Sequence, residues 1–341
     1  AIKEFPMKPL LKQLTETFGP SGYEENVRKL VRAEVKLLAD EIKVDALGNL
    51  IARKRPSKFT KDTKKIMIAA HMDEIGLMVS HIDENGFARF SNIGGVFGRY
   101  VPGGRVRFLN GVTGVLGHDR LEKVHETPAL DKIYIDVGAT SKKDCPVKVG
   151  DVAAFGRSFV EMGNRLVAKS MDDRVGVLVA IETLRSLKST PHDVYFVFTT
   201  QEEVGVRGAT TSAFGIDPDL GIAIDVTPAA DTPNAFKMEM KLGKGPCVKI
   251  QDPGMIADPR IVQWMIRTAE KNKIPYQREV LLVGSTDARA IQLARAGVPA
   301  GCLSIPVRYV HSPSEMVDFA DVQNSVKLLT ALLRTKIDLG E

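Results

Sequence analysis

Short, unbroken apolar runs alternate with helix-like patterns over much of this chain. Four of the runs are typical of strands buried on both faces, and they cover residues 66–70, 194–199, 220–224 and 300–305. Apolar residues at helical spacing predict helices at residues 9–18, 24–38, 174–187, 258–272, 287–294 and 322–333. Strands that alternate with helices favour parallel pairing. We therefore predict an α/β fold with a mostly parallel, mixed sheet and helices on both faces.

The segment that begins near residue 76 has a different pattern. Glycines are frequent there, short β-type runs lie between them, and no convincing helical pattern returns before residue 172. Asn85-Gly86 is a strong hairpin signal. This pattern predicts a small β-barrel or sandwich inserted into the α/β fold. We expect an α/β domain at residues 1–73 and 168–341, and the inserted β-rich domain at residues 74–167.

Composition and the placement of charged residues limit the classes of protein to which this chain can belong. The 341 residues are 44% hydrophobic and 26% charged, an ordinary composition for a globular chain. No apolar run approaches the ~20 residues that cross a bilayer, and residues 1–10 lack a signal-peptide pattern, so we expect no membrane partner. Three widely spaced cysteines suit a reducing compartment, which predicts a cytoplasmic location. The basic residues at 53–65 are interpreted as a solvated loop, and no nucleic-acid partner is expected.

Acidic residues and histidines follow the predicted buried strands. These positions are His71 and Asp73, Glu202 and Glu203, Asp225, and, six residues beyond the last of the four strands, His311. A further pair, Asp172-Asp173, opens the helix that follows the β-rich segment. The carboxyl ends of neighbouring parallel strands line one crevice. We therefore expect these side chains to meet there.

The residue types in this set indicate metal chemistry. Imidazoles with several carboxylates suit Zn²⁺, Co²⁺ or Mn²⁺ better than metals that prefer thiolates. Two such ions would lie roughly 3.5–4 Å apart, and they need a shared carboxylate and a bridging water. Five ligands with one bridging aspartate would give each ion three protein ligands and leave positions open for water and substrate.

Each position also has an ordinary structural interpretation. His71 could be a hydrogen-bonded core histidine, Glu202-Glu203 a solvated loop, and Asp172-Asp173 a helix cap. Asp225 could form an Asx turn, and His311 could be a loop histidine. Their shared placement at strand and helix ends favours a common site. The histidines outside this pattern are assigned structural roles; they are His81, His118, His125 and His192.

Six motifs carry a resemblance to a known family. They are Ala70-His71-Met72-Asp73-Glu74-Ile75-Gly76, Ser170-Met171-Asp172-Asp173-Arg174-Val175-Gly176, Thr200-Gln201-Glu202-Glu203-Val204-Gly205, Asp225-Val226, Ser285-Thr286-Asp287-Ala288 and Arg308-Tyr309-Val310-His311-Ser312. In these motifs, which span nearly the whole chain in the family's order, the sequence resembles the di-metal aminopeptidases of the glutamyl-aminopeptidase and tetrahedral (TET) type. That family lies within the co-catalytic zinc exopeptidase superfamily.

The resemblance implies two divalent metal ions per subunit, zinc or cobalt, with manganese as another candidate. One ion would be held by His71, Asp172 and Asp225. The other would be held by Asp172, Glu203 and His311, so that Asp172 bridges the pair.

The resemblance also implies the catalytic roles and the partners. Glu202 would act as general base and then as general acid on a water that bridges the metals, and Asp73 would orient His71. The peptide bond between Asp172 and Asp173 would be cis. The substrates would be peptides with a free N-terminus, and the inserted domain would support a homo-oligomer, from a dimer to a dodecamer.

Other functions stay open from the sequence. An endoglucanase-type glycoside hydrolase needs a sugar platform of aromatic residues, yet Trp264 is the only tryptophan. A related N-acyl deacylase or carboxypeptidase would carry its extra domain later in the chain, between the positions of Asp225 and His311. A non-enzymatic shell or binding protein would lack one of the metal-ligating residues, and none of them is missing from this sequence. Ser285 stands where the family usually has glycine, which affects only the expected side-chain preference.

Overall fold

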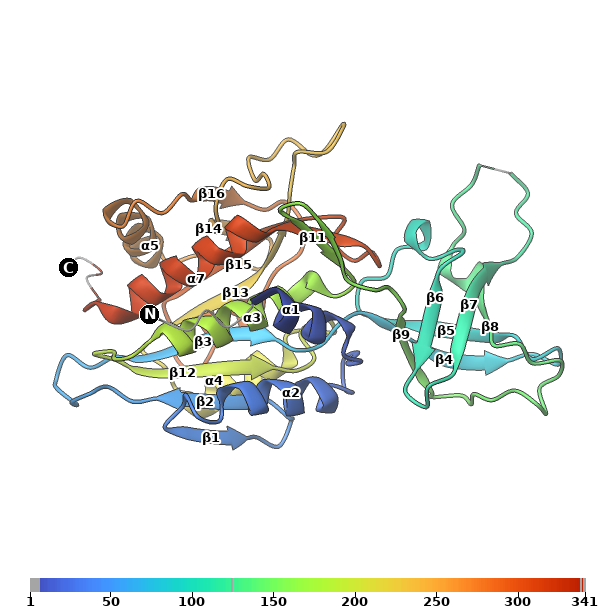
Figure 1. The fold of residues 1–341 in the computed structure, drawn as a ribbon, viewed down its shortest axis with the longest axis horizontal. Coiled ribbons are helices and arrows are strands. Elements are labelled where there is room, and N and C mark those ends of the chain that lie inside the picture. The colour runs from blue at the N-terminus through green and yellow to red at the C-terminus, as the bar shows by residue number, and fades with distance from the viewer. Residues whose placement is uncertain (1–6, 124, 338, 340–341) are drawn as a thin grey trace.

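A large sheet flanked by helices makes up one part of the molecule, and a small closed barrel lies at one end of it (Figure 1). This computed structural model describes residues 7–123, 125–337 and 339. The barrel is inserted between the third strand of the main sheet and the third helix. No helix in the described ranges is long and apolar enough to span a bilayer.

Parallel strands form the centre of the main sheet. They lie in the order β12 (Asp193–Thr199), β3 (Lys65–His71), β13 (Leu220–Pro228) and β17 (Ala300–Arg308). Thr199 pairs with His71, and Asp225 pairs with Ser304, so the carboxyl ends of these strands share one edge. The interiors of these strands are largely apolar and buried, because helices cover both faces of the sheet, as the apolar runs predict.

Antiparallel strands extend the sheet on both sides. On one side lie β2 (Leu50–Lys54) and β1 (Glu41–Val44), and on the other lie β18 (Glu315–Asp318), β11 (Arg165–Ala168) and β10 (Val160–Met162). A branch from β17 consists of β14 (Cys247–Asp252), β15 (Met255–Ile256) and β16 (Gln277–Val280). Of these, only the pair β14–β16 is parallel within the described residues. The sheet is therefore mixed, with its parallel strands at the centre.

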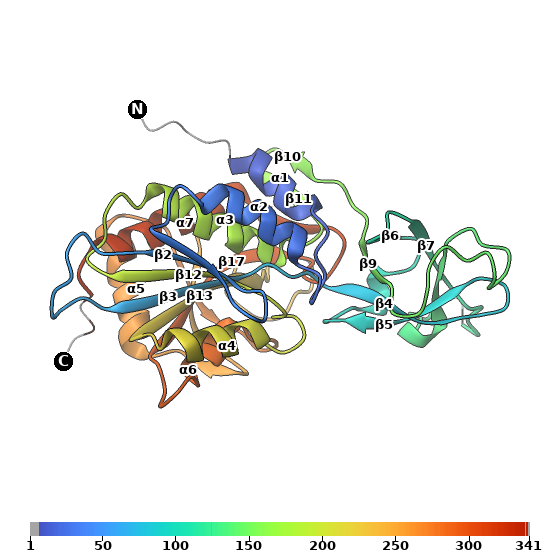
Figure 2. The ribbon, with the colours of Figure 1, turned by 90° about the horizontal axis from the view of Figure 1, so that it is seen from below.

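Helices cover both faces of the sheet (Figure 2). On one face lie α1 (Met7–Glu16), α2 (Glu25–Val35), α3 (Met171–Ser186) and α7 (Phe319–Arg334). On the other lie α4 (Arg207–Ile216) and α6 (Asp287–Gln292), while α5 (Pro259–Lys271) packs against β14. All residues of α3 from Met171 to Leu184 are buried, because α1, α2 and α7 enclose this helix against β3 and β13.

The barrel has its own apolar core. Its strands close in the order β4 (Gly76–Ile82), β5 (Ala88–Ile93), β8 (Ile133–Asp136), β7 (Thr113–His118), β6 (Arg105–Phe108) and β9 (Val152–Phe155). Short 3₁₀ turns occur at Gly98–Tyr100 and Leu130–Lys132. The predicted hairpin joins β4 to β5, and Gly86 adopts a φ of 90° there, which glycine accepts readily.

The predicted fold class is confirmed, including the inserted β-structure, which is a barrel. The predicted helices are present with ends displaced by a few residues. Helix α4 was not predicted, because its Gly, Thr and Ser residues are weak helix formers. It is held by packing on α6, β12 and β3.

Candidate metal centre

The predicted site residues meet at the carboxyl edge of the central strands. His71 is the last residue of β3, and Asp225 lies within β13. Glu202 and Glu203 follow β12, and Asp172 lies in the first turn of α3. His311 lies between β17 and β18, and Asp73 follows β3. The parallel order of the strands is what brings these distant positions together.

Asp172 lies between the two histidines. Its Oδ1 is 3.1 Å from His71 Nε2, and its Oδ2 is 3.2 Å from His311 Nε2. The same His311 nitrogen is 3.3 Å from Glu203 Oε2. The peptide bond from Asp172 to Asp173 is cis, as the resemblance implies. Each oxygen of one buried carboxylate thus faces a different imidazole, which is the arrangement that a bridging ligand requires.

Two further carboxylates lie near His71. Its Nε2 is 3.9 Å from Asp225 Oδ1 and 4.0 Å from Glu202 Oε2. Asp173 also lies close to His71 and Asp225. However, its Oδ2 accepts a hydrogen bond from the His71 backbone N–H and its Oδ1 accepts one from Gly176 N–H. Because both oxygens already have backbone donors, Asp173 is better suited to holding the start of α3 than to binding a metal.

Asp73 holds the glutamates of the site in place mainly by hydrogen bonds with their backbone. Its carboxylate accepts hydrogen bonds from the N–H groups of Glu202 and Glu203 at 3.0 and 3.1 Å, and from Ser21 Oγ at 2.6 Å. Its backbone carbonyl lies 3.1 Å from His71 Nδ1, closer than its own carboxylate at 3.4 Å. Asp73 therefore links the orientation of His71 to the placement of the two glutamates.

Residues from outside the central strands hold His311. Its Nδ1 lies 2.9 Å from the Gly95 carbonyl, which belongs to the loop between β5 and β6 of the barrel. A Cβ at Gly95 would lie 2.5 Å from that nitrogen, so only glycine fits here. Glu315 accepts hydrogen bonds from the backbone N–H groups of His311 and Asp172. Glu315 is a supporting residue that the sequence pattern did not identify, because its role depends on contacts across the fold.

Negative charge dominates the cluster. Burial raises the pKa of Glu202 and of Asp225 well above ordinary carboxyl values, and neighbouring carboxylates add to the rise. Burial would also raise the pKa of Asp172, but hydrogen bonds with His311 and His71 lower it. Burial opposes protonation of His311, yet Glu203 and Asp172 outweigh it and raise its pKa to about 12. Divalent cations would stabilise these carboxylates in their ionised form.

The donor atoms fit divalent metals. One nitrogen or oxygen each from His71, Asp172 and Glu203 lie within 4.8 Å of one another, and so do those of His71, Asp173 and Asp225. Glu203 Oε1 is buried without a hydrogen-bond partner among the described residues. Buried carboxylate oxygens are normally paired or bound to a metal. A nitrogen and oxygen set of this kind suits Zn²⁺, Co²⁺ or Mn²⁺.

Comparison with known proteins identifies the family. Residues 48–328 match the family described as M42 glutamyl aminopeptidase. The chain belongs to this family. It is therefore a hydrolase of the aminopeptidase class.

Individual aminopeptidases resemble the chain over nearly its whole length. The lysyl aminopeptidase of Pyrococcus furiosus is 40% identical over 339 residues, covering 95% of this chain and 96% of the relative. An aminopeptidase from the archaeon Desulfurococcus kamchatkensis has a TM-score of 0.92 and 44% identity, covering 96% and 94% of the two chains. The TET1 peptidase of Pyrococcus horikoshii has a TM-score of 0.86 and 35% identity, covering 96% and 99%.

The loop before α6 completes the surroundings of the centre in this M42 aminopeptidase. Thr199 Oγ1 donates a hydrogen bond of 2.5 Å to Asp287 Oδ2. Burial raises the pKa of Asp287 to about 6, although Thr199 and the charges of His71 and Arg289 oppose that rise. Ser285, the residue that departs from the family's usual glycine, donates a hydrogen bond of 3.0 Å to Asp252 Oδ1. Its hydroxyl therefore ties this loop to the end of β14.

Proposed function

We propose that this M42 enzyme removes N-terminal residues from peptides with the help of two divalent metal ions. One ion is assigned to His71, Asp172 and Asp225, and the other to Asp172, Glu203 and His311. The observation that carries this assignment is the position of the Asp172 carboxylate, whose two oxygens face the two imidazoles at 3.1 and 3.2 Å.

The metals and the protein have separate tasks in this proposal. Bound divalent ions polarise a carbonyl and can lower the pKa of a water from 15.7 toward ~7. The choice between zinc, cobalt and manganese depends on their availability as well as on the ligands. The protein supplies a rigid set of carboxylates and imidazoles whose backbone is held by Asp73, Glu315 and the buried helix α3.

Glu202 is assigned the proton transfers. Its carboxylate borders the cluster 4.0 Å from His71 Nε2, and Asp73 fixes its backbone N–H. Burial raises its pKa well above the ordinary value, so this carboxyl holds a proton more readily than an exposed glutamate does. In the proposed reaction it takes a proton from the attacking water and delivers one to the leaving amine.

The alternative functions fit this site less well. A glycoside hydrolase needs two facing carboxyl groups and aromatic residues for the sugar, whereas these carboxylates surround two histidines. A deacylase or carboxypeptidase of the same superfamily would have its extra domain later in the chain, whereas the barrel here lies between β3 and α3. A non-enzymatic role would be favoured if one of the metal-ligating residues were absent from the sequence, and none of them is.

We also propose that residues 74–167 form an oligomerisation domain next to a catalytic domain of residues 1–73 and 168–341. The barrel exposes large apolar side chains, including Phe97, Leu109, Val115 and Val149. The TET1 peptidase of Pyrococcus horikoshii can assemble into a tetrahedron or a large octahedral shell. These observations support a homo-oligomer, from a dimer to a dodecamer, for this chain.

The metal assignment predicts how many ions each variant retains. Wild-type protein should bind about two divalent ions per chain after loading and dialysis. Asp172→Ala should retain fewer than one, because both ions lose the shared carboxylate. The control is Asp131→Ala, which removes an exposed aspartate from the barrel and should leave the metal content unchanged. Elemental analysis measures the content, and undiminished metal in a folded Asp172→Ala protein would refute the assignment.

A further inference from the structure

The loop that joins β5 to β6, residues 94–104, brings the barrel against the metal centre. Besides the Gly95 carbonyl, which lies 2.9 Å from His311 Nδ1, the loop also packs on Glu203. A Cβ at Gly94 would lie 3.0 Å from Glu203 Cβ and 3.1 Å from its Oε2. We call the ion assigned to Glu203 and His311 the second ion. The barrel loop therefore contacts both of the ligands that only the second ion uses.

Phe97 of the same loop packs on the His311 ring. The two rings are stacked, with their centroids 6.0 Å apart and an angle of 29° between their planes. The Tyr100 ring meets Phe97 edge-on at 6.5 Å, and the Arg99 guanidinium lies 4.6 Å from the centre of each of these two rings. Such arrangements of aromatic and cationic groups are attractive. Phe97 is therefore held by its own loop while it packs on the imidazole.

The two histidines of the centre are enclosed to different degrees. The His71 side chain is 2% exposed and belongs to a central strand, whereas the His311 side chain is 23% exposed. His311 lies in a loop with a φ of 60°, a left-handed conformation that persists only where surrounding contacts hold it. The orientation of the His311 ring thus depends on its neighbours more than that of His71 does.

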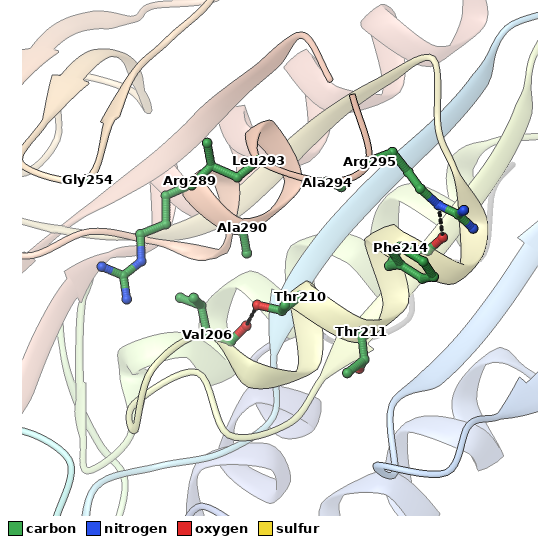
Figure 3. A pocket seen from close by; sticks show the side chains of 10 residues that line it. All are labelled: Val206, Thr210, Thr211, Phe214, Gly254, Arg289, Ala290, Leu293, Ala294 and Arg295. Atoms are coloured by element: carbon green, nitrogen blue, oxygen red, sulfur yellow. Dashed lines mark hydrogen bonds between the residues drawn. The ribbon is translucent and has the colours of Figure 1, made fainter. Parts of the chain in front are cut away.

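An exposed aromatic residue beside a metal centre could instead line a substrate pocket, and Phe97 is 41% exposed. Figure 3 shows a pocket of about 630 Å³ between α4 and α6, with Val206, Phe214 and Leu293 among its apolar residues. Among the residues that the structure describes, none from the barrel lines this pocket. The placement of Phe97 therefore supports a role through His311 and not as a wall of that pocket.

We propose that Phe97 is a positioning residue, which fixes the ring of His311 and thereby the second ion. The inference rests on the proposed function, because it assumes two ions with separate ligand sets. The Gly95 carbonyl can only accept a hydrogen bond, so Nδ1 carries the proton and Nε2 is left for the ion. Stacking on Phe97 sets the plane in which Nε2 lies. Loss of the Phe97 ring should therefore weaken the second ion and spare the first.

The test compares Phe97→Leu, which removes the ring but keeps an apolar side chain, with Phe97→Tyr, which keeps the ring. The metal-stripped protein is titrated with Co²⁺ by calorimetry. In Phe97→Leu we expect the affinity for one ion to fall about 10- to 100-fold, with a changed absorption spectrum of the bound Co²⁺, and the affinity for the other ion to stay unchanged. Phe97→Tyr should retain both affinities. The control, Phe59→Leu, makes the same change at an exposed phenylalanine outside the barrel and should have no effect.

A second background identifies the ion. His311→Ala removes the ligand through which Phe97 acts, so adding Phe97→Leu should lower Co²⁺ affinity no further. An additional loss in that background would overturn the inference, as would unchanged affinity for both ions in Phe97→Leu or an equal loss at both. A higher KM with unchanged metal binding would also overturn it and place Phe97 in the substrate site. A wild-type protein that binds a single ion would contradict the proposed function itself, so the two failures are distinguishable.

Discussion

Replacing Glu202 by Gln should lower kcat by roughly 10²–10⁴-fold, the contribution expected of a general acid–base group. Gln has the same shape but cannot accept a proton. Because Glu202 is not among the assigned metal ligands, the variant should keep its metal and its KM. Steady-state kinetics and elemental analysis on the same preparation measure both quantities. The fold should be unaffected, since burial already disfavours the charge that the substitution removes.

The control for this variant is Glu239→Gln, which changes an exposed glutamate with the same chemistry. It should retain full activity. If Glu202→Gln were fully active, the proton transfers would belong to another residue. If it lost its metal along with its activity, Glu202 would be a ligand and its assigned role would be wrong.

Replacing Glu74 by Gln should lower the free energy of unfolding by about 3–5 kcal/mol, the cost of breaking a buried ion pair. Glu74 Oε2 lies 2.6 Å from Lys169 Nζ, and its Oε1 lies 3.5 Å from Arg174 Nη2. All three side chains are buried. Without Glu74 the cluster keeps two buried cations, and Arg174 cannot relieve the repulsion by losing its proton.

Urea denaturation of the metal-depleted protein measures this effect without a contribution from bound ions. The control is Glu84→Gln, because Glu84 forms a wide ion pair of 3.7 Å with Lys142 on the surface of the barrel. Exposed pairs contribute little to stability. Similar denaturation midpoints for the two variants would show that the Glu74 cluster does not stabilise the fold.

Much of the candidate centre could be predicted from the sequence, because it follows from one property of parallel sheets. His71 ends β3, Glu202 and Glu203 follow β12, and Asp225 lies near the carboxyl end of β13, directly after its apolar run. The carboxyl ends of neighbouring parallel strands share one edge. Asp172 opens a helix that packs on those same strands. The apolar runs in the sequence and the order of the parallel strands in the sheet therefore point to the same candidate residues.

Other parts depend on contacts that no local pattern contains. The partner of His311 Nδ1 is a carbonyl of Gly95, 216 residues earlier in the chain and outside the main sheet. Lys249 is fully buried in β14, where a charged residue argues against a core strand. Its charge is compensated by Glu279 of β16 at 2.6 Å and by Asp252 at 3.4 Å. Sequence periodicity does not show such pairs. This is why the branch formed by β14, β15 and β16 was not predicted.

The most direct test of the account is the metal dependence of N-terminal cleavage. The enzyme is stripped of metal and reloaded with Co²⁺ or Zn²⁺. It is then assayed on short peptides that begin with Leu, Glu or Lys and on the N-acetylated counterpart of each peptide. We predict release of the N-terminal residue only after reloading and only from peptides with a free amino group. Cleavage by the stripped enzyme, or equal cleavage of the acetylated counterparts, would contradict a two-metal aminopeptidase centred on Asp172.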